Sequence, residues 1–382
     1  MAITQRQLDI KTAAIQDAYA ALEEELMKLV VDRLKIKTNT ELSQDSIFQW
    51  YLEKLDQLGM LNWETINELV EETKSITKKE LNELIVKEGY EENLKENKKL
   101  ANLAKTPIKE WTNLDQILNQ FFDSQWLDFE NHINQTLLST NYQVNSIARI
   151  YQQVLNDTVA RTIGGLSTPQ QSFKRAIYEM VQKGIDVSLK DKSGKSWTLE
   201  SYVRTVIKST TGTVFNDLRL ERGINKYGIV TALMSHHAAA RDACSKIQGK
   251  YVLMVPKNQA PEEFKHLPSV YDYGWKTPAG CNGINCNHRW YSQLPMKDTG
   301  MADPVSPEVA QKNAKIVAKQ RRLERSIRMA KKSLKASQWL DEPKDIDYFK
   351  SMVRTRQAVL RQFIIDNDTL LHRSYDREQV YT

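Results

Sequence analysis

Residues 229–295 decide the organisation of this chain, with IVTALMSHHAAARDACSKIQGKYVLMV at 229–255 and PSVYDYGWKTPAGCNGINCNHRWYSQL at 268–294. Two apolar runs, at 229–234 and 251–255, and an alternating run at 289–294 are typical of short strands. The segment between 236 and 247 is predicted to be a loop with a short helix. We therefore expect a small α+β unit here, in a chain whose remaining segments have mostly helical patterns.

Sulfur and imidazole donors are concentrated in the same stretch. It contains all three cysteines of the chain, and the pattern Cys281-x4-Cys286-x-His288 follows Cys244 from further upstream. Three thiolates and one imidazole make a complete tetrahedral ligand set for zinc. A structural metal would also compensate for a sheet that is too small to be stable by packing alone.

The spacing of these residues leaves a second interpretation open. It differs from the C-x2-C pattern of common zinc knuckles. The alternative is three reduced, partly buried cysteines beside a histidine whose hydrogen bonds are satisfied. An odd number of cysteines outside any secreted-type framework favours a reducing compartment.

Composition and periodicity predict long helices elsewhere. Glycine and proline, which interrupt helices, are both scarce, with 14 Gly and 10 Pro in 382 residues. Thr168 and Pro169 are typical of the start of a helix. A β-hairpin is expected near 185–198. Gly223 is expected to end a helix. Helical patterns cover residues 4–36, 47–58, 62–74, 78–104, 114–137, 144–162, 169–184, 198–222, 307–337 and 343–371. The predicted fold class is mainly α, with long N-terminal helices, the small α+β unit and a helical C-terminal tail.

The sequence divides into four expected regions. An N-terminal helical region spans 1–162, a helix-hairpin-helix connecting segment spans 163–223, the α+β zinc-binding unit spans 224–300, and a basic helical tail spans 301–382. No apolar run approaches the length of a membrane span, and the first residues lack the apolar core of a signal peptide.

Charge is distributed unevenly along the chain. Residues 1–100 carry 14 basic and 20 acidic residues, whereas residues 312–335 carry ten basic residues and the single acid Glu324. Such a one-sided helix favours an acidic partner, either double-stranded DNA or the protein's own acidic helices. The cations expected to contact DNA or another partner are Arg321, Arg322, Arg325, Arg328, Lys331, Lys332 and Lys335.

Several motifs together resemble one known family. They are Ser235-x-His237-x3-Arg241-x2-Cys244-x3-Gln248-Gly249-Lys250, Pro268-Ser269-x-Tyr271-x-Tyr273-Gly274, Gly283-x-Asn285-Cys286-x-His288 and WTLESYVRTVIKSTTGTVFNDLRLERG at 197–223. As a set they are similar to the phage minor capsid proteins of the second type, which are head-morphogenesis proteins usually encoded beside the portal. The resemblance covers residues 145–300 well and the N-terminal helices loosely.

The resemblance implies a structural role in the virion or procapsid, assembled in the host cytoplasm. It implies contact with the portal protein or the major capsid protein, and packaged DNA is a further expected partner. His237 matches a histidine of the family and is the alternate ligand of the metal centre. No mechanism follows from the residues alone for Arg241, Gln248 or Lys250.

The alternative function is a metal-dependent hydrolase or nuclease that uses His236, His237, Asp242 and the Cys/His cluster. A catalytic zinc keeps an open position, with three protein ligands and a water, whereas four soft ligands close the site. The sequence also lacks HExxH and a nucleophile elbow. We therefore expect a structural protein rather than an enzyme.

Overall fold

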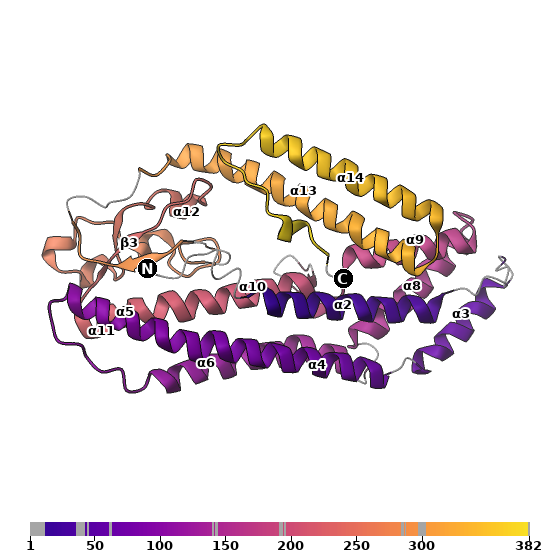
Figure 1. Cartoon of the computed structure of the whole chain (residues 1–382), viewed down its shortest axis with the longest axis horizontal. Helices are drawn as coiled ribbons and strands as arrows, with labels where there is room; N and C mark the ends of the chain where they lie inside the picture. The colour runs from indigo at the N-terminus through magenta and orange to yellow at the C-terminus, as the bar shows by residue number, and fades with distance from the viewer. Residues whose placement is uncertain are drawn as a thin grey trace. The chain divides into compact units, whose positions relative to one another are not determined.

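The computed structural model describes residues 12–35, 43, 46–60, 63–139, 141, 144–190, 194, 196–283, 286, 288–296 and 303–380 (Figure 1). The expected helical turns at 4–11 and most of the hairpin turn at 191–195 lie outside these residues. The described chain is mainly α, as the sequence predicts. None of its helices is both long and apolar enough to cross a membrane.

The chain forms two compact units, each assembled from three separate segments. Unit 1 consists of residues 1–14, 79–125 and 204–319, and unit 2 consists of residues 15–78, 126–203 and 320–382. The four regions expected from the sequence are continuous stretches and therefore group the residues differently from these two units. Several helices contribute residues to both units: α4 (Trp63–Leu81), α6 (Leu114–Phe129), α10 (Leu199–Gly212) and α13 (Pro307–Trp339). The four expected regions remain a prediction about which parts fold alone.

Unit 2 is a helical assembly with one small hairpin. Its elements include α2 (Ala13–Leu34), α3 (Ile47–Asp56), η1 (Gln57–Met60), η3 (Glu130–Asn134), α7 (Gln135–Leu138), α8 (Ser146–Ile163) and α9 (Pro169–Lys183). The rings of Tyr19 and Phe129 stack in the core at 5.5 Å between centroids. The expected hairpin is confirmed, because β1 (Asp186–Lys190) pairs antiparallel with β2 (Ser196–Thr198).

The start of α9 is also confirmed. The Thr168 hydroxyl accepts a hydrogen bond from the Gln171 backbone at 3.3 Å, and the Gln171 side chain accepts one from the Thr168 backbone at 3.4 Å. Pro169 occupies the first turn, where its missing N–H costs no helical hydrogen bond. Local sequence therefore determines this helix end.

Three predicted helix boundaries are wrong, one of them the end of the last helix, α14 (Pro343–Ile365), which was predicted near residue 371. The chain does not break between 74 and 78, because α4 continues through the π-helical η2 (Asn82–Glu88) into α5 (Gly89–Leu103). Gly223 lies inside α11 (Leu218–Tyr227), which follows α10 through the π-helical η4 (Thr213–Asp217). A Cβ at Gly223 would lie 3.3 Å from Ser292 Oγ, so this glycine permits close packing, and Gly228 ends the helix with φ +67°.

Unit 1 contains the expected three-stranded sheet. The order is β4-β3-β5, with β3 (Thr231–Met234) central and both neighbours, β4 (Tyr251–Leu253) and β5 (Trp290–Ser292), antiparallel to it. Short helical turns fill the connections: α12 (Asp242–Ser245), η5 (Lys257–Gln259), η6 (Glu262–Phe264) and η7 (Val270–Tyr273). The cysteines lie in the apolar core of this sheet, around the fully buried Trp290.

The C-terminal tail forms a helical hairpin. Helix α13 is followed by a turn at Asp341 and by α14 (Pro343–Ile365), and a short helix η8 (Tyr375–Glu378) lies near the end of the chain (Figure 1). The Arg356 guanidinium donates to the Ser326 carbonyl, which ties the second helix to the first. Both helices begin with proline at the expected residue.

Candidate metal centre

Three of the four predicted ligands converge in unit 1. The ligand atoms of Cys244, Cys286 and His288 all lie within 4.8 Å of one another. The Sγ atoms of Cys244 and Cys286 are 3.9 Å apart, and Cys286 Sγ is 3.5 Å from His288 Nδ1. Cys281 Sγ lies 4.0 Å from Cys244 Sγ. The fold thus gathers residues from both ends of the 229–295 stretch into one cluster.

These separations match the edges of a zinc tetrahedron. With zinc about 2.3 Å from sulfur and about 2.0–2.1 Å from nitrogen, tetrahedral angles give a sulfur–sulfur edge of about 3.8 Å and a sulfur–nitrogen edge of about 3.6 Å. The corresponding observed distances are 3.9, 4.0 and 3.5 Å. These three distances are compatible with zinc, whereas Cys281 lies outside the group of donors that are all within 4.8 Å of one another.

Of the four predicted ligands, Cys281 makes the fewest contacts with the others. Its thiol donates to the Ala243 carbonyl at 3.6 Å, and its contact with the other ligands is through Cys244. The first three ligands are thus already near coordinating positions, whereas the fourth is adjacent.

Cys244 is positioned by a short helix and by Arg241. Helix α12 follows Arg241, whose guanidinium donates to the Pro278 carbonyl at 3.1 Å. This bond holds the 274–283 loop, which carries Cys281, against the start of α12. Arg241, for which the sequence suggested no mechanism, therefore connects the two chain segments that supply sulfur.

The loop that carries Cys281 depends on glycine. A Cβ at Gly280 would lie 1.9 Å from the Gly274 carbonyl oxygen, and one at Gly283 would lie 2.1 Å from the Thr277 carbonyl oxygen. No side chain fits at either position. The backbone of this loop approaches itself so closely that only glycine can occupy positions 280 and 283.

Hydrogen bonding and burial favour the uncharged forms of Cys244, Cys286 and His288 in the folded protein. The hydrogen bond to Cys281 is the main cause that raises the pKa of Cys244 to about 12, and the bond with Cys244 likewise raises the pKa of Cys286 to about 12. Burial lowers the pKa of His288. Zinc would have to displace thiol protons, so binding should release protons and weaken in acid.

His237 lies beside the cluster. Its ring meets the ring of His288 edge to face, at 4.6 Å between centroids and 75° between planes. Its nitrogen atoms are not part of the group that lies within 4.8 Å. It remains the alternate ligand of the prediction.

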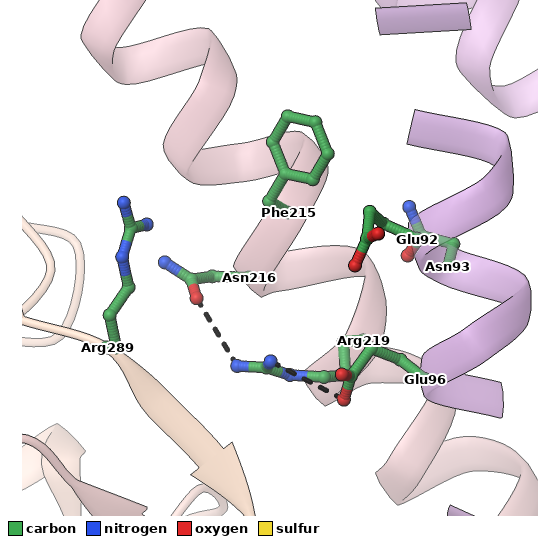
Figure 2. A pocket seen from close by; sticks show the side chains of 7 residues that line it. All are labelled: Glu92, Asn93, Glu96, Phe215, Asn216, Arg219 and Arg289. Atoms are coloured by element: carbon green, nitrogen blue, oxygen red, sulfur yellow. Dashed lines mark hydrogen bonds and ion pairs between the residues drawn. The ribbon is translucent and has the colours of Figure 1, made fainter. Parts of the chain in front are cut away.

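A buried arginine holds β5, the strand that follows His288. Arg219 donates to the Asn216 side chain at 3.3 Å and to the Trp290 carbonyl, and it lies 3.6 Å from Glu96. Figure 2 shows Arg219 between Asn216 and Glu96, with Arg289 on the other side of Asn216. Burial lowers the pKa of Arg219, and the charge of Glu96 opposes that shift. Arg219 was not singled out from the sequence, because its partners lie on α5 and β5.

Several cations of the basic helix α13 form ion pairs within unit 2. Lys332 lies 2.8 Å from Glu23, Lys335 pairs with Glu24, and Arg328 lies 3.5 Å from Glu200. Arg321 pairs with Glu324 at 2.9 Å, and Lys331 is half-buried. Arg322 and Arg325 are exposed and form no ion pair with any described residue. The acidic N-terminal helix is therefore an internal partner of part of the predicted cationic set.

The comparisons with known proteins agree with the resemblance seen in the motifs. Residues 3–365 match the family "Phage minor capsid protein 2". The chain is 34% identical over 368 residues to a "Structural protein" of Lactococcus phage LL-H, covering 96% of this chain and 98% of the relative. It is 33% identical over 113 residues to a "Structural protein" of Lactococcus phage mv4, covering 30% of this chain and 91% of that relative.

No solved structure matches the chain. The family match extends over the helices as well as the sheet unit, so it does not depend on the Cys/His cluster alone. The chain belongs to the phage minor capsid protein 2 family.

Proposed function

We propose that this chain is a structural component of the phage head that binds the portal protein or the major capsid protein, and that one zinc ion stabilises its α+β unit. The observation that supports the proposal is the cluster of Cys244, Cys286 and His288, whose donor atoms all lie within 4.8 Å of one another. The cluster belongs to the unit that contains the sheet of three short strands. The structural-protein relatives support the role in the head.

The ligand set supports a structural ion rather than a catalytic one. Closed sites are typical of structural zinc, and in this proposal Cys281, whose Sγ is 4.0 Å from Cys244 Sγ, supplies the fourth ligand. The two buried thiols lie among apolar side chains of the core. A metal held there would add its binding free energy to the stability of the folded unit.

The proposed assembly route runs through the host cytoplasm, where the reduced state of the cysteines would be kept, and ends in the virion. The experiment that tests the partner is co-expression with the portal protein and, separately, with the major capsid protein. Stable co-purification with either one is expected. An untagged control and an unrelated phage tail protein should not co-purify, and failure with both head proteins would contradict the proposed role.

The experiment that tests the metal is elemental analysis of protein purified in reducing buffer without added metal. About one zinc per chain is expected, because the four donors make one tetrahedral set. Protein that is fully folded and free of metal would remove zinc from the proposal and leave a cluster of buried thiols.

Double-stranded DNA is a second proposed partner, supported by the exposed cations of α13. Lys312, Lys315, Lys319, Arg322 and Arg325 are all exposed. The first four recur every three or four residues, which places them on one face of the helix. Contacts from such a face would go to phosphates and would not depend on base sequence.

A metal-dependent hydrolase or nuclease is the competing function. It would need an open zinc position, and His237 beside His288 is the residue best placed to assist a bound water. Chelator-sensitive cleavage of DNA that is abolished by His237→Ala would favour this enzyme over the structural role. Cleavage that survives the substitution would instead indicate a contaminant.

A further inference from the structure

Gln248 connects two histidines at the metal centre. Its side chain is fully buried, and its Oε1 accepts a hydrogen bond from the His237 backbone N–H at 2.9 Å. The same Oε1 atom lies 3.2 Å from His288 Nε2. One side-chain oxygen thus contacts both the segment after β3 and the imidazole that contributes to the cluster.

The backbone donor determines which way the Gln248 amide points. Side-chain amides can be placed with O and N exchanged, and their hydrogen-bond partners decide between the two orientations. A backbone N–H can only donate, so the atom that faces His237 N must be the oxygen. This orientation is then the only one that satisfies the bond.

The orientation of Gln248 in turn determines the tautomer of His288. Because a carbonyl oxygen can only accept, Nε2 of His288 must carry the proton that points to Oε1. In the neutral imidazole the other nitrogen, Nδ1, then has its lone pair free. Nδ1 is the atom that lies 3.5 Å from Cys286 Sγ, on the side of the thiols.

Gln248 is itself held firmly. Its backbone N–H donates to the carbonyl of Cys244, another ligand, at 2.9 Å. The next residue, Gly249, donates to Met234 at 2.9 Å and has φ +70°, which only glycine adopts readily. A Cβ there would also lie 3.0 Å from Pro304 Cγ. Gln248 therefore links the positions of Cys244 and His288, which come from opposite ends of the 229–295 stretch.

We propose that Gln248 is a positioning residue of the metal centre, which holds His288 as the Nε2–H tautomer and so selects Nδ1 as the zinc ligand. This inference rests on the proposed zinc site and extends it. Hydrogen bonds to the second nitrogen of a ligating histidine orient the ring and raise its basicity, and their loss typically costs about 10–100-fold in metal affinity.

The test compares the full chain with Gln248→Ala, Gln248→Glu and Gln293→Ala. The last variant makes the same truncation in the same unit, at a residue whose amide donates to the Tyr251 hydroxyl rather than to the metal centre. Zinc affinity is measured by competition with a chromophoric chelator. Long-range ¹H–¹⁵N spectra of ¹⁵N-histidine protein report the tautomer of His288, assigned with His288→Gln.

Wild type is expected to show the Nε2–H tautomer with and without zinc. Gln248→Ala should lose about 10–100-fold in zinc affinity and show a mixture of tautomers without metal. Gln248→Glu keeps an acceptor oxygen for both donors, so its affinity and tautomer should stay close to wild type. Gln293→Ala should leave both measurements unchanged.

The outcomes separate this inference from the zinc site itself. Wild type that binds no zinc overturns the metal centre and this role with it. Zinc binding by wild type, together with the Nδ1–H tautomer or an unchanged affinity in Gln248→Ala, overturns the role of Gln248 alone. If Gln248→Ala does not fold, the wild-type tautomer and the Gln248→Glu rescue still decide the question.

Discussion

Cys286 is the sulfur ligand that lies near both Cys244 and His288. We expect Cys286→Ser to lose zinc. At free zinc about a thousand times the dissociation constant, loss of binding removes about 4 kcal/mol of unfolding free energy. Cys281→Ser should retain more metal, because Cys281 touches the cluster through Cys244 only.

The measurement is zinc content and thermal unfolding of both variants beside wild type, in reducing buffer. Equal stability of wild type and Cys286→Ser would contradict a structural metal. So would a Cys281–Cys286 disulfide in wild type under the same reducing conditions.

Arg219 offers a second prediction at the scale of one residue. Arg219→Met would leave the Trp290 carbonyl without its donor and Glu96 with Lys99 as its remaining ion-pair partner. Breaking one side of a buried ion pair costs about 3–5 kcal/mol. Chemical denaturation should show that loss, whereas Lys226→Met, an exposed change on the same helix, should have little effect. A loss below about 1 kcal/mol would mean that Glu96 finds water or another partner.

The sequence could predict that Cys244, Cys286 and His288 lie together, but not which other residues contact them. Cys281, Cys286 and His288 are close in sequence, and zinc chemistry makes the link to Cys244 reasonable. Gln248 and Arg219 act through partners that are 40 and 71 positions away. Which donor meets which acceptor over such distances depends on the packed fold, and no local pattern encodes it.

At the scale of elements, α13 is anchored to α2 by a buried ion pair within unit 2. Glu23 accepts from Lys332 at 2.8 Å and from the Ile185 backbone at 2.9 Å. Burial alone would lower the pKa of Lys332, but the charges of Glu23 and Glu200 outweigh burial and raise it. The charged form is thus favoured in the folded protein.

We expect Lys332→Met to destabilise the protein by about 3–5 kcal/mol, because it leaves Glu23 buried and unpaired. The double variant Lys332→Met with Glu23→Gln should recover part of this loss. Since folding raises the pKa of Lys332, the pair's contribution is complete below the ordinary lysine pKa of about 10.5 and is lost only as pH rises through the folded value. Denaturation of the three proteins at pH 7 and pH 11 tests both statements, and strictly additive losses would contradict a direct pair.

The exposed face of α13 carries the DNA prediction. Arg322→Gln with Arg325→Gln should reduce the salt dependence of duplex binding, by a slope of about 0.9 for each phosphate that is no longer neutralised. Lys79→Gln with Lys98→Gln removes the same charge from exposed positions on α4 and α5 and is the matched control. Binding is measured at several salt concentrations. Equal slopes for both variants, or no binding by wild type at low salt, would remove DNA from the partners.

Helix ends differ in how well the sequence predicts them. The Thr168 cap is correct because all of its hydrogen bonds are local. The predicted helix end at Gly223 was wrong because a glycine can either end a helix or allow the helix to pack closely against a neighbouring segment. The position of Ser292 in the fold shows that Gly223 has the second role. The α4–η2–α5 continuity was missed because a π-helical turn absorbs the irregular spacing of apolar residues.

At the scale of the whole molecule, zinc removal should have a local effect. Only the small sheet depends on the proposed ion, whereas the helices of unit 2 have their own buried core. A chelator should expose Trp290, which is fully buried beside the cysteines, and red-shift its fluorescence while helical circular dichroism falls little. The Trp290→Phe variant lacks this fluorophore, so comparison with wild type shows which part of the fluorescence change comes from Trp290. A cooperative loss of all helical signal would contradict this prediction.

The interleaving of the two units has a consequence for synthesis on the ribosome. Unit 1 receives its last segment at residues 204–319, and unit 2 receives its last segment at residues 320–382. The Lys332–Glu23 pair joins residues 309 positions apart. The N-terminal helix α2 can therefore make this contact only after α13 has been synthesised, near the end of translation. Nascent chains would expose apolar helix faces during that time, which favours chaperone binding. A prematurely terminated chain would lack part of unit 2, so incomplete products would be poorly folded.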